Sequence, residues 1–469
     1  MTRRGSRLFL PGRPRVLRPG PAEVRTYGSG FAMPRGRLGL PGHRATTAHF
    51  SAVYPFFFEE GLGFRGQFVG DDLYGGAFHY DPFIAYEEGH VTSPNMVLLG
   101  LIGSAKSALV KTLVRRGELW RRRAFVVDTK PEYGPLARAM GVEPVVVLPG
   151  GGVRINPLSP RVSEAEQLLL LEKAGEALVG RPLKAEERAA LIDVVRLVRE
   201  RAGSREPTLP EVVRLLFDPP AEVAARLYVE PAFLARKTWE LACALRLLCT
   251  APGLRGMFDG PTTSKLDLDG PLVVLDISAL KASAGELLPV AMAIAMAWLR
   301  AAAGGEGAER RAREAGGRHA LHLSLVLDEA WLALAVPAVA DFVQQSFKFS
   351  RAAGWQNIVV FHRLSDVLAA ADQGTRHAHV VRGLVADAET RVIYRQPPDE
   401  IPELRRAFHL TDTQCELAQG LPRARGLWLV GQRPFLVDHR RGPDEIVFTV
   451  TDEGMLGATE QEMLRREGA

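Results

Sequence analysis

The sequence contains few cysteines and lacks any apolar segment of membrane-spanning length. Its 469 residues include three cysteines, Cys243, Cys249 and Cys415, and no two of them have C-x-x-C spacing. An odd count with this spacing does not indicate a disulfide framework and favours a reduced, cytoplasmic compartment. The most apolar run, Leu287–Leu299, is shorter than the roughly 20 residues that cross a bilayer, so we expect a buried helix there.

The sequence also lacks an even distribution of charge. Residues 1–50 contain ten arginines and one glutamate, a local charge of +9, so the rest of the chain carries −4 and the whole chain +5. No apolar segment follows this basic stretch, which excludes a secretory signal. We therefore expect residues 1–47 to form a disordered basic tail. Contact of that tail with DNA or anionic lipid stays open.

A glycine-rich turn follows a short apolar run at residues 96–99. A strand, a glycine loop, Lys106-Ser107 and a helix, in that order, are typical of a P-loop. In such a loop the backbone N–H groups hold phosphate, the lysine reaches the outer phosphates and the serine hydroxyl binds Mg²⁺. Ala105 stands where the motif has its second glycine, so an ordinary glycine loop remains an alternative. The predicted cofactors are ATP and Mg²⁺, and the predicted binding residues are Gly100, Gly103, Ser104, Ala105, Lys106, Ser107 and Ala108.

An apolar strand farther along the chain ends in two carboxylates. Residues 321–327 are mostly apolar, and Asp328 and Glu329 follow directly. Beside a P-loop, Asp328 is expected to hold Mg²⁺ and Glu329 to orient and deprotonate the attacking water. The alternative is a strand followed by a helix whose dipole the two acids complement. The upstream Lys106-Ser107 pair favours the nucleotide site.

The chain between these two stretches has one βαβ unit and one helical region. The apolar run Ala124–Asp128 ends in a carboxylate that either faces a ligand at the carboxyl end of its strand or caps the next turn. Residues 163–250 carry apolar side chains at helical spacing, and Ser163 and Glu166 have capping-box spacing. We expect an α-helical insertion that interrupts the sheet domain.

The remaining divisions follow from shifts in composition. Alternating aromatic and glycine residues predict a small β region at residues 48–92, in which Asp81-Pro82-Phe83 is expected to form a turn. The predicted parts are the basic tail (1–47), the β region (48–92), the first part of the P-loop domain (93–162), the helical insertion (163–250), the second part (251–450) and a C-terminal tail (451–469).

Two further residues are candidates for catalysis. Arg351 lies near the end of a predicted helix and could stabilise charge across a subunit boundary, since loose phosphoryl-transfer states need cations on their equatorial oxygens. His362 follows the next predicted strand and could sense the γ-phosphate. A position with no catalytic role is the alternative for His362.

These stretches together resemble a known family. The segments GLIGSAKSALVKT, VVDTKPEYGPLA, RINPL, LVVLDISAL, LVLDEAWLAL, FKFSRAAGWQNIVVFH and TRVIYRQ, in this order within residues 60–450, resemble the ATPase domain of conjugative-transfer and type IV secretion ATPases, in the FtsK–HerA branch of P-loop NTPases. The resemblance implies an α/β fold with a RecA-like P-loop NTPase sheet, a hexameric ring and ATP sites between neighbouring subunits. It also implies that Lys106 and Ser107 bind phosphate and Mg²⁺, that Asp328 and Glu329 are the acidic pair, and that Arg351 and Arg395 act on a neighbour's site.

The chain departs from the family at three places. Ala105 replaces the P-loop glycine, His362 stands where the family usually has glutamine, and only a short β region precedes the P-loop. We expect a cytoplasmic, ring-forming ATPase at the inner face of the membrane, which partners a secretion or conjugation membrane complex and moves DNA or protein. A DNA translocase and a nucleotide-binding scaffold with little turnover remain the alternatives.

Overall fold

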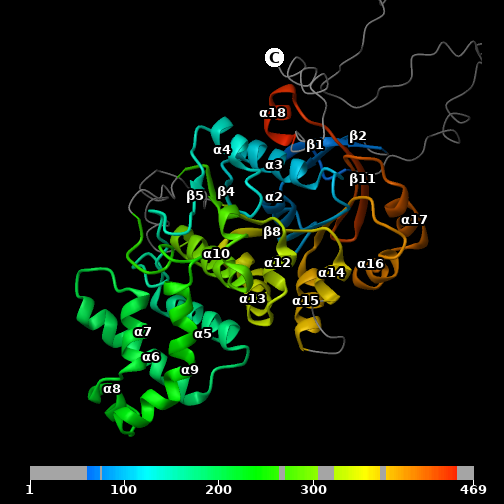
Figure 1. Cartoon of the computed structure of the whole chain (residues 1–469). Helices are drawn as coiled ribbons and strands as arrows, with labels where there is room; N and C mark the ends of the chain where they lie inside the picture. Colours follow the sequence, from blue (N-terminus) through cyan, green and yellow to red (C-terminus); the bar gives the residue numbers. More distant parts are fainter. Residues whose placement is uncertain (1–60, 74–75, 264–269, 305–321, 370–375, 451–469) are drawn as a thin grey trace, which may run out of the picture.

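A single mixed sheet organises the chain. The computed structural model describes residues 61–73, 76–263, 270–304, 322–369 and 376–450 (Figure 1). The predicted tails at 1–47 and 451–469, and residues 48–60 of the predicted β region, lie outside the described residues. The strands are β1 (Gln67–Asp72), β2 (Gly76–Tyr80), β3 (Met96–Leu99), β4 (Arg123–Asp128), β5 (Val145–Val146), β6 (Leu272–Asp276), β7 (Leu323–Leu327), β8 (Trp355–Phe361), β9 (Thr390–Ile393), β10 (Arg425–Val430) and β11 (Arg433–His439).

The centre of the sheet is parallel and one side of it is antiparallel. The strand order is β2-β1-β11-β10-β9-β3-β8-β7-β4-β6-β5. The strands from β9 to β5 pair in parallel, whereas β10, β11, β1 and β2 pair antiparallel. All residues of β3 and β8 are buried, as expected for parallel strands covered on both faces. Because parallel strands end at the same edge, the loops after β3, β4, β7, β8 and β9 meet at one edge of the sheet.

Helices cover both faces of the sheet. In β3, Val97 and Leu99 face one apolar core and Met96 and Leu98 the other, because side chains alternate along a strand. α3, α4 and α18 pack on the second core, and α10, α12, α13 and α15 pack on the first (Figure 1). The helices of the two layers and of the antiparallel side are α2 (Pro82–Glu87), α3 (Lys106–Gly117), α4 (Gly134–Ala139), α10 (Leu288–Gly304), α12 (Ala330–Leu334), α13 (Pro337–Ala353), α14 (Leu364–Ala369), α15 (Arg376–Asp387), α16 (Ile401–Phe408), α17 (Asp412–Gly420) and α18 (Ile446–Thr449).

A group of helices lies between β5 and β6 in the chain and projects away from the sheet (Figure 1). Ser163 and Glu166 form the predicted capping box at its start. α5 packs against α10 and α13, so the group is joined to one helical layer of the sheet domain. Its members are α5 (Glu164–Val179), α6 (Ala185–Ala202), α7 (Leu209–Phe217), α8 (Ala221–Arg226) and α9 (Pro231–Thr250).

The chain before the P-loop differs from the sequence expectation. The predicted turn at Asp81-Pro82-Phe83 is wrong, because these residues begin α2. Asp81 caps that helix by accepting from the N–H groups of Phe83 and Ile84, and Pro82 at the first helical position lacks the N–H that would have no partner there. β1 pairs with β11, so the early strands extend the main sheet.

The apolar run Leu287–Leu299 lies in the buried helix α10 from Leu288 onward, as predicted. Residues 290–299 are all buried because this helix lies between the sheet and the neighbouring helices α5, α12 and α13. Among the helices that the structure describes, none is long and apolar enough to cross a bilayer.

Candidate nucleotide site

The loop after β3 has left-handed residues at two positions, one of which is an alanine. Ala105 has a φ of 82°, a conformation that costs an L-residue roughly 1–2 kcal/mol. Gly103 has a φ of 78°. Gly100 is required by close packing, because an added Cβ would lie 2.6 Å from Tyr394 Cβ and 2.7 Å from Ser104 Oγ. The loop therefore keeps its tight shape despite the alanine, with local backbone strain.

Several backbone donors of this loop lack protein acceptors. The N–H groups of Gly103, Ala105 and Lys106 form no hydrogen bond within the part of the chain that the structure describes, whereas Ser104 N–H donates to Leu101 O at 3.2 Å. The free donors lie at the N-terminus of the twelve-residue helix α3, where the helix dipole also favours an anion. This cluster of free donors fits a phosphate group.

Lys106 is folded back onto the loop. Its side chain is buried, and Nζ donates to Gly100 O at 2.6 Å and to Leu101 O at 3.0 Å. Burial lowers the pKa of Lys106 to about 8, although the carboxylates of Asp328 and Glu329 act in the opposite direction. The carbonyl oxygens of Gly100 and Leu101 thus occupy the ammonium of Lys106. In a nucleotide complex, phosphate oxygens would take the place of these acceptors.

Asp328 is fixed by two donors. Its Oδ1 accepts from the N–H of Glu329 at 3.0 Å and its Oδ2 from the hydroxyl of Tyr133 at 3.0 Å. Each oxygen keeps a further lone pair for a hydrated cation. No group of three or more His, Cys, Asp or Glu side chains gathers to hold a metal among the described residues. Mg²⁺ bound with a nucleotide needs few protein ligands, so Asp328 and the half-buried Ser107 fit that ion.

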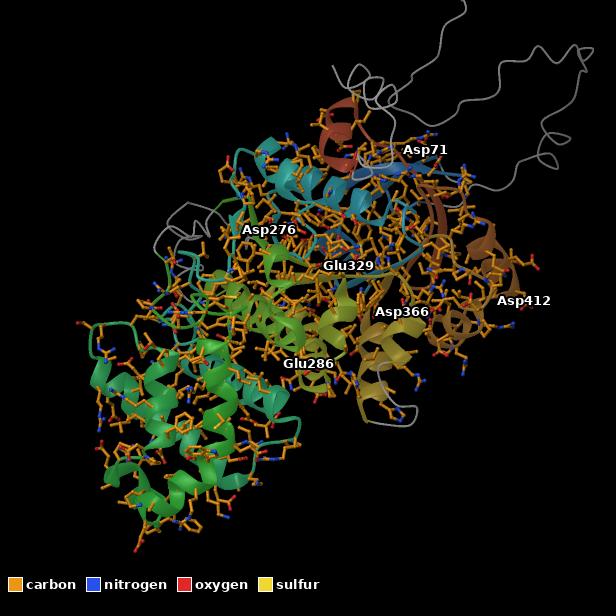
Figure 2. All side chains as sticks on the ribbon, in the orientation of Figure 1. Asp71, Asp276, Glu286, Glu329, Asp366 and Asp412 are labelled. Carbon is orange, nitrogen blue, oxygen red and sulfur yellow. The ribbon has the colours of Figure 1, made fainter. Side chains whose placement is uncertain are left out.

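Glu329 receives three side-chain donors. It is buried, at the position before α12, with a φ of 57°. Its Oε1 accepts from His362 Nε2 at 3.0 Å and pairs with Lys130 Nζ, and its Oε2 accepts from Trp331 Nε1 at 2.7 Å. Glu329 occupies the N-cap position of α12, where the helix alternative from the sequence places it, but its side chain forms no cap hydrogen bond and pairs with these three donors. Figure 2 shows Glu329 at the centre of the molecule, whereas Asp71 and Asp412 lie at its periphery.

A chain of hydrogen bonds joins the P-loop to this glutamate. Lys106 Nζ lies 3.1 Å from His362 Nδ1. An ammonium can only donate, so Nδ1 accepts and Nε2–H donates to Glu329. Burial alone would raise the pKa of Glu329, but the hydrogen bonds from His362, Lys130 and Trp331 outweigh burial and hold that pKa well below its usual range.

A second set of charges lies behind the acidic pair. Asp128 accepts from the N–H groups of Lys130 at 3.0 Å and Tyr133 at 2.8 Å, so it caps the turn after β4, the second of its two predicted roles. Lys111 is fully buried in α3, and its ammonium lies 5.2 Å from the centre of the Tyr133 ring, with no hydrogen bond to the part of the chain that the structure describes. Burial lowers the pKa of Lys111, and nearby carboxylates, Glu132 first among them, oppose that shift.

The structure separates the two candidate arginines. Arg395 lies two residues beyond the carboxyl end of β9, its side chain is exposed, and its carbonyl accepts from Leu101 N–H at 3.1 Å. Arg351 lies in the last turn of α13, which leads into the amino end of β8. It is therefore at the edge of the sheet opposite Lys106, and only Arg395 adjoins the loop within this chain. Action of either arginine on a neighbour's site stays a prediction.

Three residues that contact the acidic pair were not among the predicted site residues. Lys130 and Tyr133 belong to the turn after β4, and Trp331 is two positions beyond Glu329. The turn sequence DTKPEY, which places a lysine and a tyrosine at the carboxyl edge, was the available signal for the first two. Of the predicted phosphate-binding residues, Ser104 is buried in the loop and Ala108 is buried in the first turn of α3.

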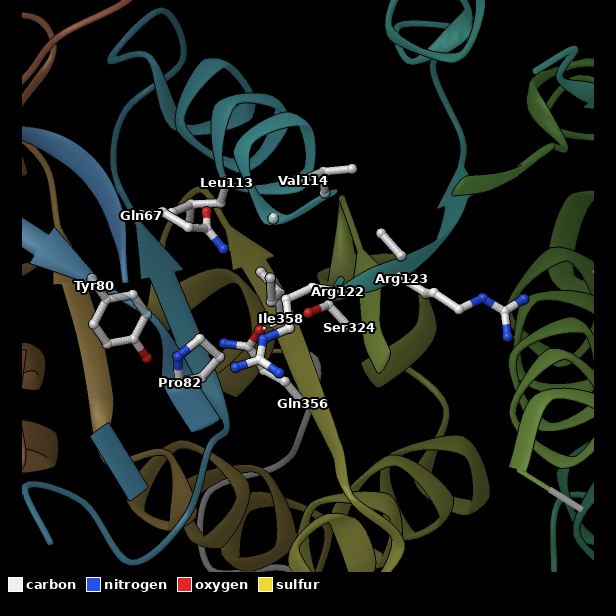
Figure 3. A pocket seen from close by; sticks show the side chains of 12 residues that line it. Gln67, Tyr80, Pro82, Leu113, Val114, Arg122, Arg123, Ser324, Gln356 and Ile358 are labelled. Carbon is white, nitrogen blue, oxygen red and sulfur yellow. Dashed lines mark hydrogen bonds between the residues drawn. The ribbon is translucent and has the colours of Figure 1, made fainter. Parts of the chain in front are cut away.

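A small hollow lies at the opposite edge of the sheet (Figure 3). Gln67, Arg122, Ser324 and Gln356 contribute to its lining, at the amino ends of β4, β7 and β8. Gln67 Oε1 and Gln356 Nε2 are buried and have no hydrogen-bond partner among the residues that the structure describes, which fits ordered water. The hollow lies at the amino edge of the parallel strands, whereas the candidate nucleotide site lies at their carboxyl edge, so the two are separate.

The strand order, the P-loop and the acid-ended strand β7 define a RecA-like P-loop NTPase fold, so the predicted fold class is confirmed. A scan of protein-family models and a search of curated proteins give no match. Among solved structures, VirB4 of Thermoanaerobacter pseudethanolicus aligns with a TM-score of 0.65 at 20% identity, over 83% of this chain and 100% of that chain. The plasmid coupling protein TrwB, in complex with ADP and Mg²⁺, aligns with a TM-score of 0.52 at 13% identity, over 81% of this chain and 90% of that chain.

Proposed function

We propose that this chain hydrolyses Mg-ATP and uses the energy to drive DNA or protein transfer in conjugation or type IV secretion. The observation that carries the proposal is the convergence of Lys106, His362 and Glu329 at the carboxyl edge of the sheet, beside free P-loop donors. The likeness in fold to VirB4 along its whole length supports the choice of transfer system.

Each residue of the site would have its own role in the reaction. Loop N–H groups and Lys106 bind the phosphates, and Glu329 orients and deprotonates the attacking water once its donors release an oxygen. Ser107 and Asp328 would hold Mg²⁺, which neutralises phosphate charge when bound. The solved complex of TrwB with ADP and Mg²⁺ supports nucleotide and Mg²⁺ as the cofactors of the present chain.

The proposal includes a hexameric ring at the inner face of the membrane, held by a secretion or conjugation complex. In such a ring Arg351 or Arg395 would complete a neighbour's site. Both side chains are exposed, as contact with a neighbouring subunit requires.

Nucleotide binding and hydrolysis by the full chain test this function. We expect Mg-dependent binding of a fluorescent ATP analogue that is lost in Lys106→Ala, and ATP hydrolysis that is lost in Glu329→Gln. Stimulation of hydrolysis by DNA would favour the DNA translocase over a protein-transfer ATPase. Binding without hydrolysis above the Glu329→Gln level would favour the scaffold, for which the strain at Ala105 is the supporting observation.

A further inference from the structure

We infer that Lys130 is a second phosphate-binding lysine, which pairs with Glu329 in the nucleotide-free chain and moves to the outer phosphates when ATP binds. The inference rests on the proposed function and adds a binding residue to the same site. It assigns to one ammonium two alternative partners, a carboxylate and a phosphate.

The position of Lys130 suits such an exchange. It follows β4, which pairs with β7, so the turn that carries it lies beside the acidic pair at the carboxyl edge. Its side chain is 38% exposed, whereas that of Glu329 is 7% exposed. The ammonium therefore reaches a buried carboxylate from the solvent side of the site, where a nucleotide would enter.

The pairing with Lys130 also weakens Glu329 as a base for the proposed chemistry. Both carboxylate oxygens are occupied, Oε2 by Trp331 and Oε1 by His362 and Lys130. A carboxylate held by three donors is a poor acceptor for a proton from water. Departure of Lys130 removes an ammonium charge that contacts Glu329 directly.

A polyphosphate supplies the force for that departure. The two ammonium groups of Lys106 and Lys130 repel each other, and this repulsion adds to the lowering of the pKa of Lys106. The outer phosphates of ATP carry more negative charge than one carboxylate, so they attract both ammonium groups together. ADP lacks the terminal phosphate, and Lys130 would keep its contact with Glu329.

The choice of lysine over arginine at this site is consistent with the inference. The chain has 50 arginines and nine lysines, and three of the nine are Lys106, Lys111 and Lys130. An ammonium is a compact charge with three rotatable donors, which can change partners in a confined space more readily than a planar guanidinium. Three lysines around one site are a marked local departure from the composition of the chain.

Affinity measurements on the full chain test the inference. Fluorescent ADP and a fluorescent non-hydrolysable ATP analogue are titrated in the presence of Mg²⁺ with wild type and Lys130→Met. We expect the affinity for the ATP analogue to fall about tenfold, which corresponds to one charge-assisted hydrogen bond, and that for ADP by less than about twofold. Lys130→Arg retains the charge and should restore most of the difference. Lys173→Met is the matched control, because Lys173 also pairs with a glutamate, Glu176 at 2.7 Å, in α5.

Repeating the titrations in a Glu329→Gln background separates binding from mere pairing. A loss for the ATP analogue that persists in this background supports direct phosphate contact. A loss that disappears there, or one that is equal for ADP and the ATP analogue, overturns the inference while leaving the proposed function intact. If wild type binds neither nucleotide, the proposed function itself fails. Thermal unfolding of each variant confirms that the protein measured is folded.

Discussion

At the scale of single residues, Ala105 shows how far packing can replace a motif glycine. Its left-handed backbone is imposed by the surrounding loop, in which Gly100 packs against Tyr394 and Ala424 N–H donates to Ser104 O at 3.3 Å. The alanine adopts the left-handed conformation at a cost in conformational energy. A departure from the motif therefore weakens the sequence signal more than it disturbs the site.

Ala105→Gly should stabilise the chain. Glycine relieves the left-handed strain but loses more backbone entropy on folding, so we expect a gain of about 0.5–1 kcal/mol in the free energy of unfolding. Nucleotide affinity should change by less than about twofold, because the loop already has its binding shape. Urea unfolding and nucleotide titration measure the two quantities. A loss of stability would show that the loop does not have this backbone conformation.

Tyr133 is expected to position Asp328 for Mg²⁺. In Tyr133→Phe we expect the Mg²⁺ concentration for half-maximal nucleotide binding to rise about tenfold, as for other residues that orient metal ligands. Tyr80→Phe is the matched control, since Tyr80 is equally buried and its hydroxyl donates to Thr390 Oγ1 at 2.9 Å, away from the site. Both variants lose about 1–2 kcal/mol of stability. Equal Mg²⁺ requirements in the two variants would refute the positioning role.

At the scale of elements, α2 is a short helix that the sequence did not predict. Its N-cap Asp81 has a second partner, Arg122, which donates from Nε and Nη2 at 2.9 Å each. The Arg122 guanidinium also lies 4.9 Å from the centre of the Phe83 ring. The helix is thus fixed by one carboxylate that joins the region before the P-loop to the start of β4.

Asp81→Ala should destabilise the chain by about 3–5 kcal/mol, because it leaves Arg122 partly buried without its counter-charge and removes the cap. Ser163→Ala removes the exposed cap of α5 and should cost about 1 kcal/mol. Urea unfolding of both variants gives the comparison. Similar small losses in the two would mean that the Asp81–Arg122 pair contributes little.

Elements with a strong local pattern were predicted from the sequence, whereas contacts that depend on strand pairing were not. The strands β3, β7 and β8 and the helix α10 are strongly apolar, so their existence followed from composition. Lys106, Asp328 and Glu329 were predicted because local sequence indicates them: Lys106 belongs to the P-loop pattern, and the two acids come directly after an apolar strand. The contacts of Glu329 with Lys130 and of Asp328 with Tyr133 depend on the pairing of β4 with β7, which no local pattern specifies. The short α2 was missed because its proline was interpreted as part of a turn.

At the scale of the whole molecule, one buried histidine links stability to pH. Among the described residues, neither ring nitrogen of His439 on β11 has a hydrogen-bond partner, and burial, together with Arg116 and Arg441, lowers its pKa to about 3. The folded chain therefore keeps His439 neutral where the unfolded chain, with an ordinary pKa of 6.5, takes up a proton. The contribution to stability is constant above that ordinary pKa and falls as pH decreases toward the folded pKa.

His439→Leu should remove this pH dependence. Between about pH 7.5 and pH 5 we expect wild type to lose about 2 kcal/mol more than the variant in the free energy of unfolding. Urea unfolding at several pH values measures the difference. Parallel losses in the two proteins would show that His439 is protonated, or solvated, in the folded chain.

The central claim is that the carboxyl edge of the sheet forms an ATPase site completed by neighbouring subunits. The most direct measurement is ATP hydrolysis by the full chain across a range of protein concentrations, beside Glu329→Gln. We predict that turnover per chain rises with protein concentration, because assembly completes each site, and that it is absent in the variant at every concentration. Turnover that stays at the level of Glu329→Gln at all concentrations, despite nucleotide binding, would contradict the account.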